Sequence, residues 1–147
     1  MARTFECDVL VVGSGVAGMA AAIKAASQGL SVIVAEKDEY FGGTTAISAG
    51  WAWVPGNKAG VAAGDTREEA EEYLRNLAPD TFNAEGVSQF LDTVPEAISF
   101  FENETDVKFI YPEKAPDYKM DLPGAKMAGR AIIPRMWMPG SSATSAC

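Results

Sequence analysis

The sequence has no histidine, only two cysteines and fewer bases than acids, and each shortage narrows the possible chemistry. Without histidine, this stretch can hold no Ser-His-Asp or Cys-His catalytic group, no His-ligated zinc and no histidyl-linked cofactor. Cys7 and Cys147 lie far apart without metal-ligand spacing, so we expect no metal site and a reducing, cytoplasmic location. Twelve bases against twenty acids give a net charge of −8, which disfavours nucleic-acid binding through a basic face.

Long apolar runs are also missing. The longest uncharged stretch, residues 9–23, contains three glycines. It is shorter than the roughly twenty residues that a transmembrane helix needs, so we predict no membrane span. Apolar residues nevertheless make up 48% of the 147 positions. That is enough for one packed domain and too little for two ordinary ones.

The N-terminal part has the pattern of a βαβ unit. Residues 7–12 form an apolar, β-branched run, which is typical of a buried parallel strand. Residues 16–28 are alanine-rich and end at Gly29, as a helix does, and residues 30–36 form a second apolar run. We therefore predict an α/β fold: a Rossmann-like βαβ unit with additional helices and an incomplete parallel sheet.

The rest of the chain is mainly helical in pattern. Residues 37–64 lack periodicity and predict an ordered loop region. Thr66-x-x-Glu69 is a capping box that begins a helix, and a second helix carries Val87, Phe90 and Leu91. Thr93-x-x-Glu96, with Pro95 inside it, predicts a third helix.

Two further features lie in this second part. Residues 65–104 carry eleven acids and two arginines, which we interpret as the solvated face of the helices. Residues 107–111 predict a short strand, and residues 141–147 end the chain without a cap or packing pattern. We divide the chain into residues 1–64, around the βαβ unit, and residues 65–147, a helical extension that begins a substrate-side region.

The turn between the first strand and the helix has G-x-G-x-x-G spacing, Gly13-Ser14-Gly15-Val16-Ala17-Gly18. It follows a strand, opens a helix and is succeeded by an acid, Glu36, at the end of the next strand, which is the context that dinucleotide binding requires. Gly13 permits the sharp turn, Gly15 lets the backbone approach a pyrophosphate, and Gly18 lets helix and strand pack closely. An acid at position 36 can accept from a ribose hydroxyl and disfavours a 2′-phosphate.

The glycine turn alone does not separate FAD from NAD. Gly42-Gly43-Thr44-Thr45 follows the second strand, where a simple NAD domain would usually enter another helix. Such a glycine pair can bring backbone amides and threonine hydroxyls near a pyrophosphate and an isoalloxazine ring. This segment favours FAD, and an NAD-binding domain remains the alternative.

Together these motifs resemble the N-terminal part of FAD-dependent oxidoreductases of the succinate dehydrogenase/fumarate reductase flavoprotein superfamily. The similarity is greatest to its 3-ketosteroid Δ1-dehydrogenase-like branch and covers roughly residues 5–135. It rests on residues 8–22, 31–36, 39–50, 53–57, 115–118, 122–124 and 129–130.

The resemblance implies a set of site residues. The candidate cofactor-binding residues are Gly13, Ser14, Gly15, Val16, Ala17, Gly18, Glu36, Lys37, Gly42, Gly43, Thr44, Thr45, Ser48, Ala49 and Gly50. Tyr118, in a Pro-Asp-Tyr stretch, resembles a tyrosine that lines the substrate pocket; a loop tyrosine packed at its rim is the alternative. Because histidine is absent, the implied FAD is held non-covalently.

The resemblance also implies the reaction: two-electron transfer to flavin N5 from a CH–CH bond beside a carbonyl. The expected substrate is a small molecule, either a steroid-like enone or a dicarboxylate. A fumarate-type reductase of the same superfamily and a non-catalytic truncated fragment are the alternatives. The family's second flavin-binding segment and later catalytic tyrosines have no counterpart here. We therefore expect the 147 residues to need the missing C-terminal part and to be inactive alone.

Overall fold

The computed structural model describes residues 4–135. They fall into two compact units, one ending at Gly50 and one beginning at Trp51. The division into residues 1–64 and 65–147 concerns domains rather than these units and stays a prediction. The C-terminal stretch 141–147, including Cys147, lies outside the described residues.

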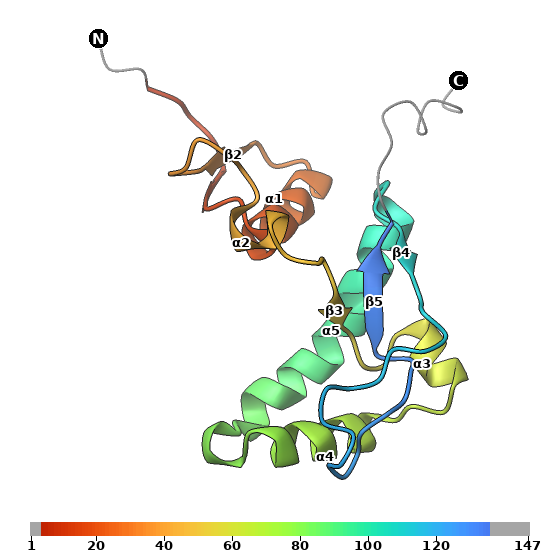
Figure 1. Ribbon diagram of the computed structural model, residues 1–147. Helices are drawn as coiled ribbons and strands as arrows, with labels where there is room; N and C mark the ends of the chain where they lie inside the picture. The colour runs from red at the N-terminus through yellow and green to blue at the C-terminus, as the bar shows by residue number, and fades with distance from the viewer. Residues whose placement is uncertain (1–3, 136–147) are drawn as a thin grey trace, which may run out of the picture. The chain divides into compact units, whose positions relative to one another are not determined.

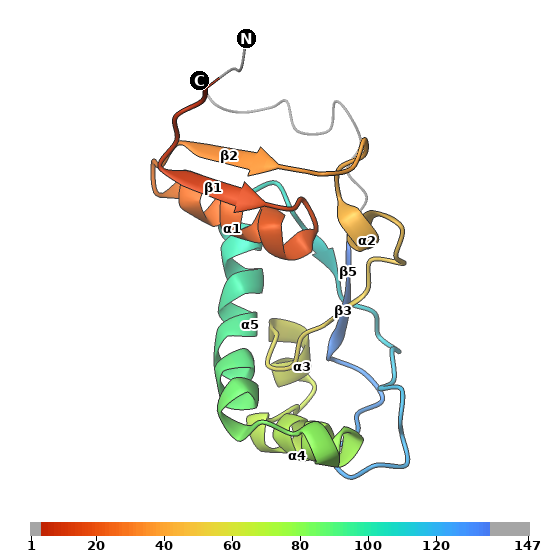
Figure 2. The same cartoon turned by 90° about the vertical axis from the view of Figure 1, so that its left-hand side faces the viewer.

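The first unit contains the predicted βαβ arrangement. Strand β1 (Val9–Val12), helix α1 (Val16–Ser27) and strand β2 (Val32–Ala35) follow one another, and the short helix α2 (Gly43–Ala46) comes after β2. The strands are parallel, with Val9 opposite Val32 and Val12 opposite Ala35 (Figure 2). Their carboxyl ends therefore meet at one edge, where the glycine turn begins.

Only one face of this two-stranded sheet is covered within the unit. A β-carbon on Gly18 would lie 3.3 Å from Val11 Cγ1, so Val11 faces α1, and Val11 is buried. Leu10 and Val12 alternate to the other face, and 60% and 82% of their surfaces are exposed. The predicted incomplete parallel sheet is confirmed for the described residues.

The second unit combines helices with a small antiparallel sheet (Figure 1). Strand β5 runs between β3 and β4, with Ile132 opposite Ala52 and Ile133 opposite Ile110. Helices α4 and α5 pack against each other. The elements are β3 (Ala52–Trp53), α3 (Lys58–Ala62), α4 (Arg67–Leu77), the 3₁₀ helix η1 (Pro79–Thr81), α5 (Ala84–Glu104), β4 (Phe109–Ile110) and β5 (Ala131–Pro134).

The predicted loop region 37–64 is wrong in part, because it contains α2, β3 and α3. Each of these elements has five residues or fewer, too short for a repeat to show in the sequence. Local capping explains α3: the Asn57 side-chain oxygen accepts from the amides of Ala59 at 2.9 Å and Gly60 at 3.0 Å.

The capping box before α4 is confirmed. Thr66 Oγ1 accepts from Glu69 N at 3.2 Å, and Glu69 Oε2 accepts from Thr66 N at 3.3 Å. The predicted second and third helices, by contrast, are one helix, α5, with Pro95 inside it. Proline removes one backbone donor, at a cost of about 3 kcal/mol. The apolar face continues across it: Leu91 is buried and Ile98 half-buried, so packing on both sides keeps the helix continuous.

Candidate functional site

The glycine turn in the first unit leaves open space beside its backbone. Gly13 has φ 98°, which favours glycine, and its amide donates to Ala35 O at 2.8 Å. Gly15 precedes α1 with φ −64° and ψ 174°, and no side chain caps the helix there. A β-carbon on Gly15 would meet no atom within 4 Å, whereas one on Gly18 would lie 2.0 Å from Gly13 O. Gly18 is thus needed for packing, and Gly15 faces space that a ligand can enter.

The start of α1 faces the same space with backbone amides that have no acceptor within the helix. The first intrahelical bond runs from Met19 N to Gly15 O at 2.9 Å, so the amides of residues 16–18 have no acceptor within the helix. Val16 N instead donates to Thr45 Oγ1 at 3.2 Å, while the side chains of Val16 and Ala17 are exposed. Amides and the positive end of the helix dipole together suit a phosphate group.

Glu36 ends the second strand with its carboxylate held by four donors. Oε2 accepts from Ser14 N at 2.9 Å and from Ser14 Oγ at 2.5 Å. Oε1 accepts from Lys37 N at 2.8 Å and from Asp38 N at 3.1 Å, while the Lys37 side chain is exposed. These hydrogen bonds lower the pKa of Glu36 from 4.5 to about 2, and the bond from the Ser14 hydroxyl has the largest effect. Glu36 is therefore an anion at neutral pH, which suits ribose hydroxyls and repels a 2′-phosphate.

The lowered pKa of Glu36 predicts an acid-side loss of stability. Because the folded-state pKa of about 2 lies below the ordinary 4.5, the stabilisation is complete above pH 4.5 and is lost as pH falls towards 2. Urea unfolding of the intact gene product at pH 5 and pH 3 should therefore show a smaller pH effect in Glu36→Gln than in the wild type. An equal drop in both would contradict the assigned hydrogen bonds.

The turn after the second strand lies against the glycine turn. Gly42 has φ 107° and its amide donates to Ser14 Oγ at 2.7 Å. A β-carbon on Gly43 would lie 3.6 Å from the Cα of Gly15, so the two backbones approach closely. Three segments, the glycine turn, Glu36 and the Gly42–Thr45 turn, therefore meet at one edge of the sheet. Thr44, within this turn, is exposed. The remaining predicted residues, Ser48, Ala49 and Gly50, continue the segment, and the first two of them are exposed.

The second unit carries Tyr118, the predicted substrate-pocket residue. Its side chain is 100% exposed, but both neighbours are anchored. Asp117 Oδ1 accepts from Trp53 Nε1 at 2.6 Å, and Lys119 N donates to Tyr73 Oη at 3.2 Å. The backbone on each side of Tyr118 is thus fixed while the phenol itself is free to contact a ligand.

A buried ionic cluster that the sequence did not predict supports this loop. Arg130, with 0% of its surface exposed, donates from Nη2 to Asp65 Oδ1 at 2.7 Å and from Nη1 to Asp117 Oδ2 at 2.9 Å. Asp65 is buried, so the predicted solvated face of residues 65–104 is wrong at this residue. One arginine inside the apolar run 128–134 was the available signal, because a charge there needs buried partners.

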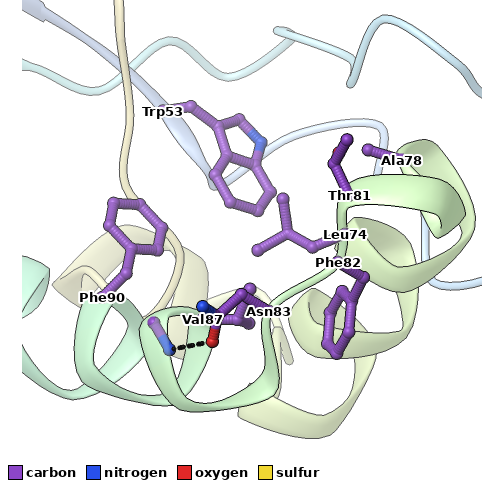
Figure 3. A pocket seen from close by; sticks show the side chains of 9 residues that line it. Trp53, Leu74, Ala78, Thr81, Phe82, Asn83, Val87 and Phe90 are labelled. Carbon is purple, nitrogen blue, oxygen red and sulfur yellow. Dashed lines mark hydrogen bonds between the residues drawn. The ribbon is translucent and has the colours of Figure 1, made fainter.

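An apolar pocket of about 360 Å³ lies between α4, η1 and α5 (Figure 3). Trp53 and Phe90 stack there with ring centroids 6.2 Å apart. Two polar atoms of the lining already have partners: Trp53 Nε1 donates to Asp117, and Asn83 Oδ1 accepts from Gly86 N at 2.9 Å. The pocket therefore offers packing surface but no acid or base. Its lining residues are Trp53, Leu74, Ala78, Thr81, Phe82, Asn83, Gly86, Val87 and Phe90.

Residues 4–135 contain neither a candidate membrane-spanning helix nor a candidate metal-binding cluster. No helix in this range is both long enough and apolar enough to cross a membrane. The same residues contain no group of three or more histidine, cysteine, aspartate or glutamate side chains arranged to hold a metal ion.

Known proteins similar to this chain include several dehydrogenases. The 4-oxocyclohex-2-ene-1-carboxylate 5-dehydrogenase of Sinomonas cyclohexanicum is 80% identical over 133 residues, which is 90% of this chain and 22% of that protein. The 3-oxosteroid 1-dehydrogenase of Mycolicibacterium smegmatis is 42% identical over 132 residues, 88% of this chain and 23% of that protein. The chain thus spans less than a quarter of the length of either relative.

A solved structure has the same fold. The crystal structure of 3-ketosteroid Δ1-dehydrogenase from Sterolibacterium denitrificans, in complex with 1,4-androstadiene-3,17-dione, matches with a TM-score of 0.81 and 35% identity. The match covers 88% of this chain and 23% of that structure. The predicted similarity to the ketosteroid-dehydrogenase-like branch is therefore confirmed.

A family model described as "FAD binding domain" matches residues 8–135, which include the glycine turn, Glu36 and the Gly42–Gly50 segment. This match favours FAD over the NAD alternative. The chain belongs to the FAD binding domain family.

Proposed function

We propose that this chain forms the adenosine- and pyrophosphate-binding part of a non-covalent FAD site in a dehydrogenase that acts on a carbon–carbon bond beside a ring ketone. The proposal rests on one observation. Three segments meet at one edge of the β1–β2 sheet: the glycine turn, Glu36 and the Gly42–Thr45 turn. Bound FAD would supply the electron acceptor for hydride at flavin N5.

Each part of the site has a distinct task in holding FAD. The backbone at Gly15 and the first amides of α1 bind the pyrophosphate, because the space in front of Gly15 is open and the helix dipole is positive there. The Glu36 carboxylate accepts a hydrogen bond from a hydroxyl of the adenosine ribose. Gly43, Thr45 and the residues up to Gly50 lie along the flavin side. The absence of histidine supports non-covalent binding.

Tyr118 is the proposed substrate contact of this chain. Its anchored neighbours fix the backbone, and its exposed phenol can donate to or accept from a ketone or hydroxyl oxygen. The other catalytic groups of the dehydrogenase come, in this proposal, from sequence that the matched quarter of the relatives does not include.

The proposed substrate is a monocyclic oxo-carboxylate rather than a steroid. The Sinomonas relative, at 80% identity, is named for a 4-oxocyclohexene carboxylate, and the steroid dehydrogenase of Mycolicibacterium smegmatis is 42% identical. The dicarboxylate-reductase alternative receives no support from these relatives. The cysteine usage supports a cytoplasmic location for the protein.

The visible spectrum of the purified intact gene product tests this function. We expect flavin absorbance, release of the flavin by acid precipitation, and anaerobic bleaching by 4-oxocyclohex-2-ene-1-carboxylate at low concentration. Androst-4-ene-3,17-dione should bleach the flavin more slowly, and fumarate should not reoxidise the reduced form. A protein without flavin absorbance after incubation with FAD would refute the FAD site. Faster bleaching by the steroid would refute the substrate class.

A further inference from the structure

The hydroxyl of Ser14 joins the three segments of the candidate site. Ser14 is 2% exposed. Its Oγ donates to Glu36 Oε2 at 2.5 Å and accepts from Gly42 N at 2.7 Å. One buried oxygen therefore links the glycine turn, the end of β2 and the start of the Gly42–Thr45 turn.

The other donors to Glu36 differ from this hydroxyl in kind. Ser14 N, Lys37 N and Asp38 N are backbone amides whose directions the chain fixes. The Ser14 hydroxyl is a side-chain donor, so a substitution at this position removes it and leaves the three amide donors in place. The same substitution removes the acceptor of the Gly42 amide, so it also loosens the start of the Gly42–Thr45 turn.

We propose that Ser14 is a positioning residue for FAD rather than a direct phosphate ligand. Its hydroxyl holds the Glu36 carboxylate and the Gly42 amide in place, so that the adenosine ribose meets a carboxylate that is already oriented. The inference rests on the proposed FAD site. It predicts that Ser14 affects FAD affinity through Glu36.

A second serine offers a matched control. Ser31 makes the same two bonds to a carboxylate, from its N to Asp8 Oδ2 at 2.8 Å and from its Oγ to Asp8 Oδ2 at 2.6 Å. This pair lies at the amino ends of the two strands, away from the glycine turn. Ser31→Ala thus removes an equivalent hydrogen bond from the same unit without touching the candidate site.

The test measures the FAD dissociation constant of the deflavinated intact gene product by quenching of flavin fluorescence. We expect Ser14→Ala to weaken FAD binding about tenfold, the net effect of one hydrogen bond to a charged group, and Ser31→Ala to change it less than about twofold. Ser14→Cys, which keeps the volume and donates weakly, should resemble Ser14→Ala and serves if the alanine variant does not fold.

A double-mutant cycle with Glu36→Ala separates positioning from direct contact. If Ser14 acts through Glu36, Ser14→Ala costs less than about threefold once Glu36 is already alanine. Equal costs in both backgrounds would overturn the proposal, and so would unchanged affinity in Ser14→Ala. A wild-type protein that binds no FAD would instead refute the proposed function itself.

Discussion

Alanine at Gly15 is expected to weaken FAD binding about a hundredfold without unfolding the protein. The β-carbon would meet no atom of the chain within 4 Å, and φ −64° with ψ 174° is backbone that alanine adopts readily. The same carbon would occupy the space that we assign to the pyrophosphate. Loss of two charge-assisted hydrogen bonds there corresponds to about 3 kcal/mol, or about a hundredfold in the FAD dissociation constant.

Alanine at Gly18 is expected to destabilise the fold rather than to block the FAD site directly. Its β-carbon would lie 2.0 Å from the backbone oxygen of Gly13, so α1 and β1 would have to separate. We expect the free energy of unfolding to fall by about 3 kcal/mol, because backbone cannot move aside as a flexible side chain can. The same glycine-to-alanine substitution in the same motif should therefore weaken FAD binding at position 15 and weaken folding at position 18.

Urea unfolding and FAD titration of the intact gene product, performed on both variants, check this pair. Gly86→Ala in the second unit is the control: its β-carbon would make ordinary contact at 3.6 Å in α5, and both measurements should stay near the wild-type values. Tight FAD binding by Gly15→Ala would show that the pyrophosphate does not lie at this position.

Replacing Arg130 with methionine is expected to cost about 3–5 kcal/mol of unfolding free energy. The arginine side chain is fully buried between Asp65 and Asp117, whose side chains are 1% and 2% exposed. Removing the cation leaves two buried carboxylates without their partner, which is the costly way to break a buried ion pair. Asp117 also precedes Tyr118, so the loop that presents the tyrosine loses one of its hydrogen bonds while Trp53 still donates to Asp117.

Arg67→Met provides the matched control for this substitution. Arg67 pairs with Asp92 at 3.1 Å and with Glu71 at 3.2 Å, but 39% of its side chain is exposed. Surface pairs of this kind contribute about 1 kcal/mol or less. Chemical denaturation should therefore separate the two variants clearly. Equal losses would mean that the Arg130 cluster is not buried as described.

The βαβ unit could be predicted because each of its parts leaves a local signal. Strand, turn, helix and acid follow in a fixed order, and Gly18 is required by a contact with Gly13, five residues away. The capping box at Thr66 is equally local, since its two hydrogen bonds span three residues. The proposed cofactor residues could be predicted for the same reason. Ser14 and Glu36 follow two strands that pair directly, so the order of the elements brings them into hydrogen-bond contact.

Long-range pairing could not be predicted in the same way. Asp65 and Arg130 are 65 positions apart, so a carboxylate surrounded by other acids gave no sign that it would be buried. The predicted helix boundary at Pro95 is wrong for a related reason. A proline beside a capping-box pattern predicts a helix start, but packing on both sides of Pro95 keeps α5 continuous. In both cases tertiary contacts outweighed a local preference.

Calorimetric titration of the deflavinated gene product with FAD, FMN and NAD tests the central claim most directly. If the adenosine half binds at the glycine turn and Glu36, FAD should bind at least about a hundredfold more tightly than FMN, which lacks the adenosine. NAD shares the adenosine half but not the flavin, so it should compete with FAD only weakly. Equal affinity for FMN and FAD, or tighter binding of NAD than of FAD, would contradict this assignment.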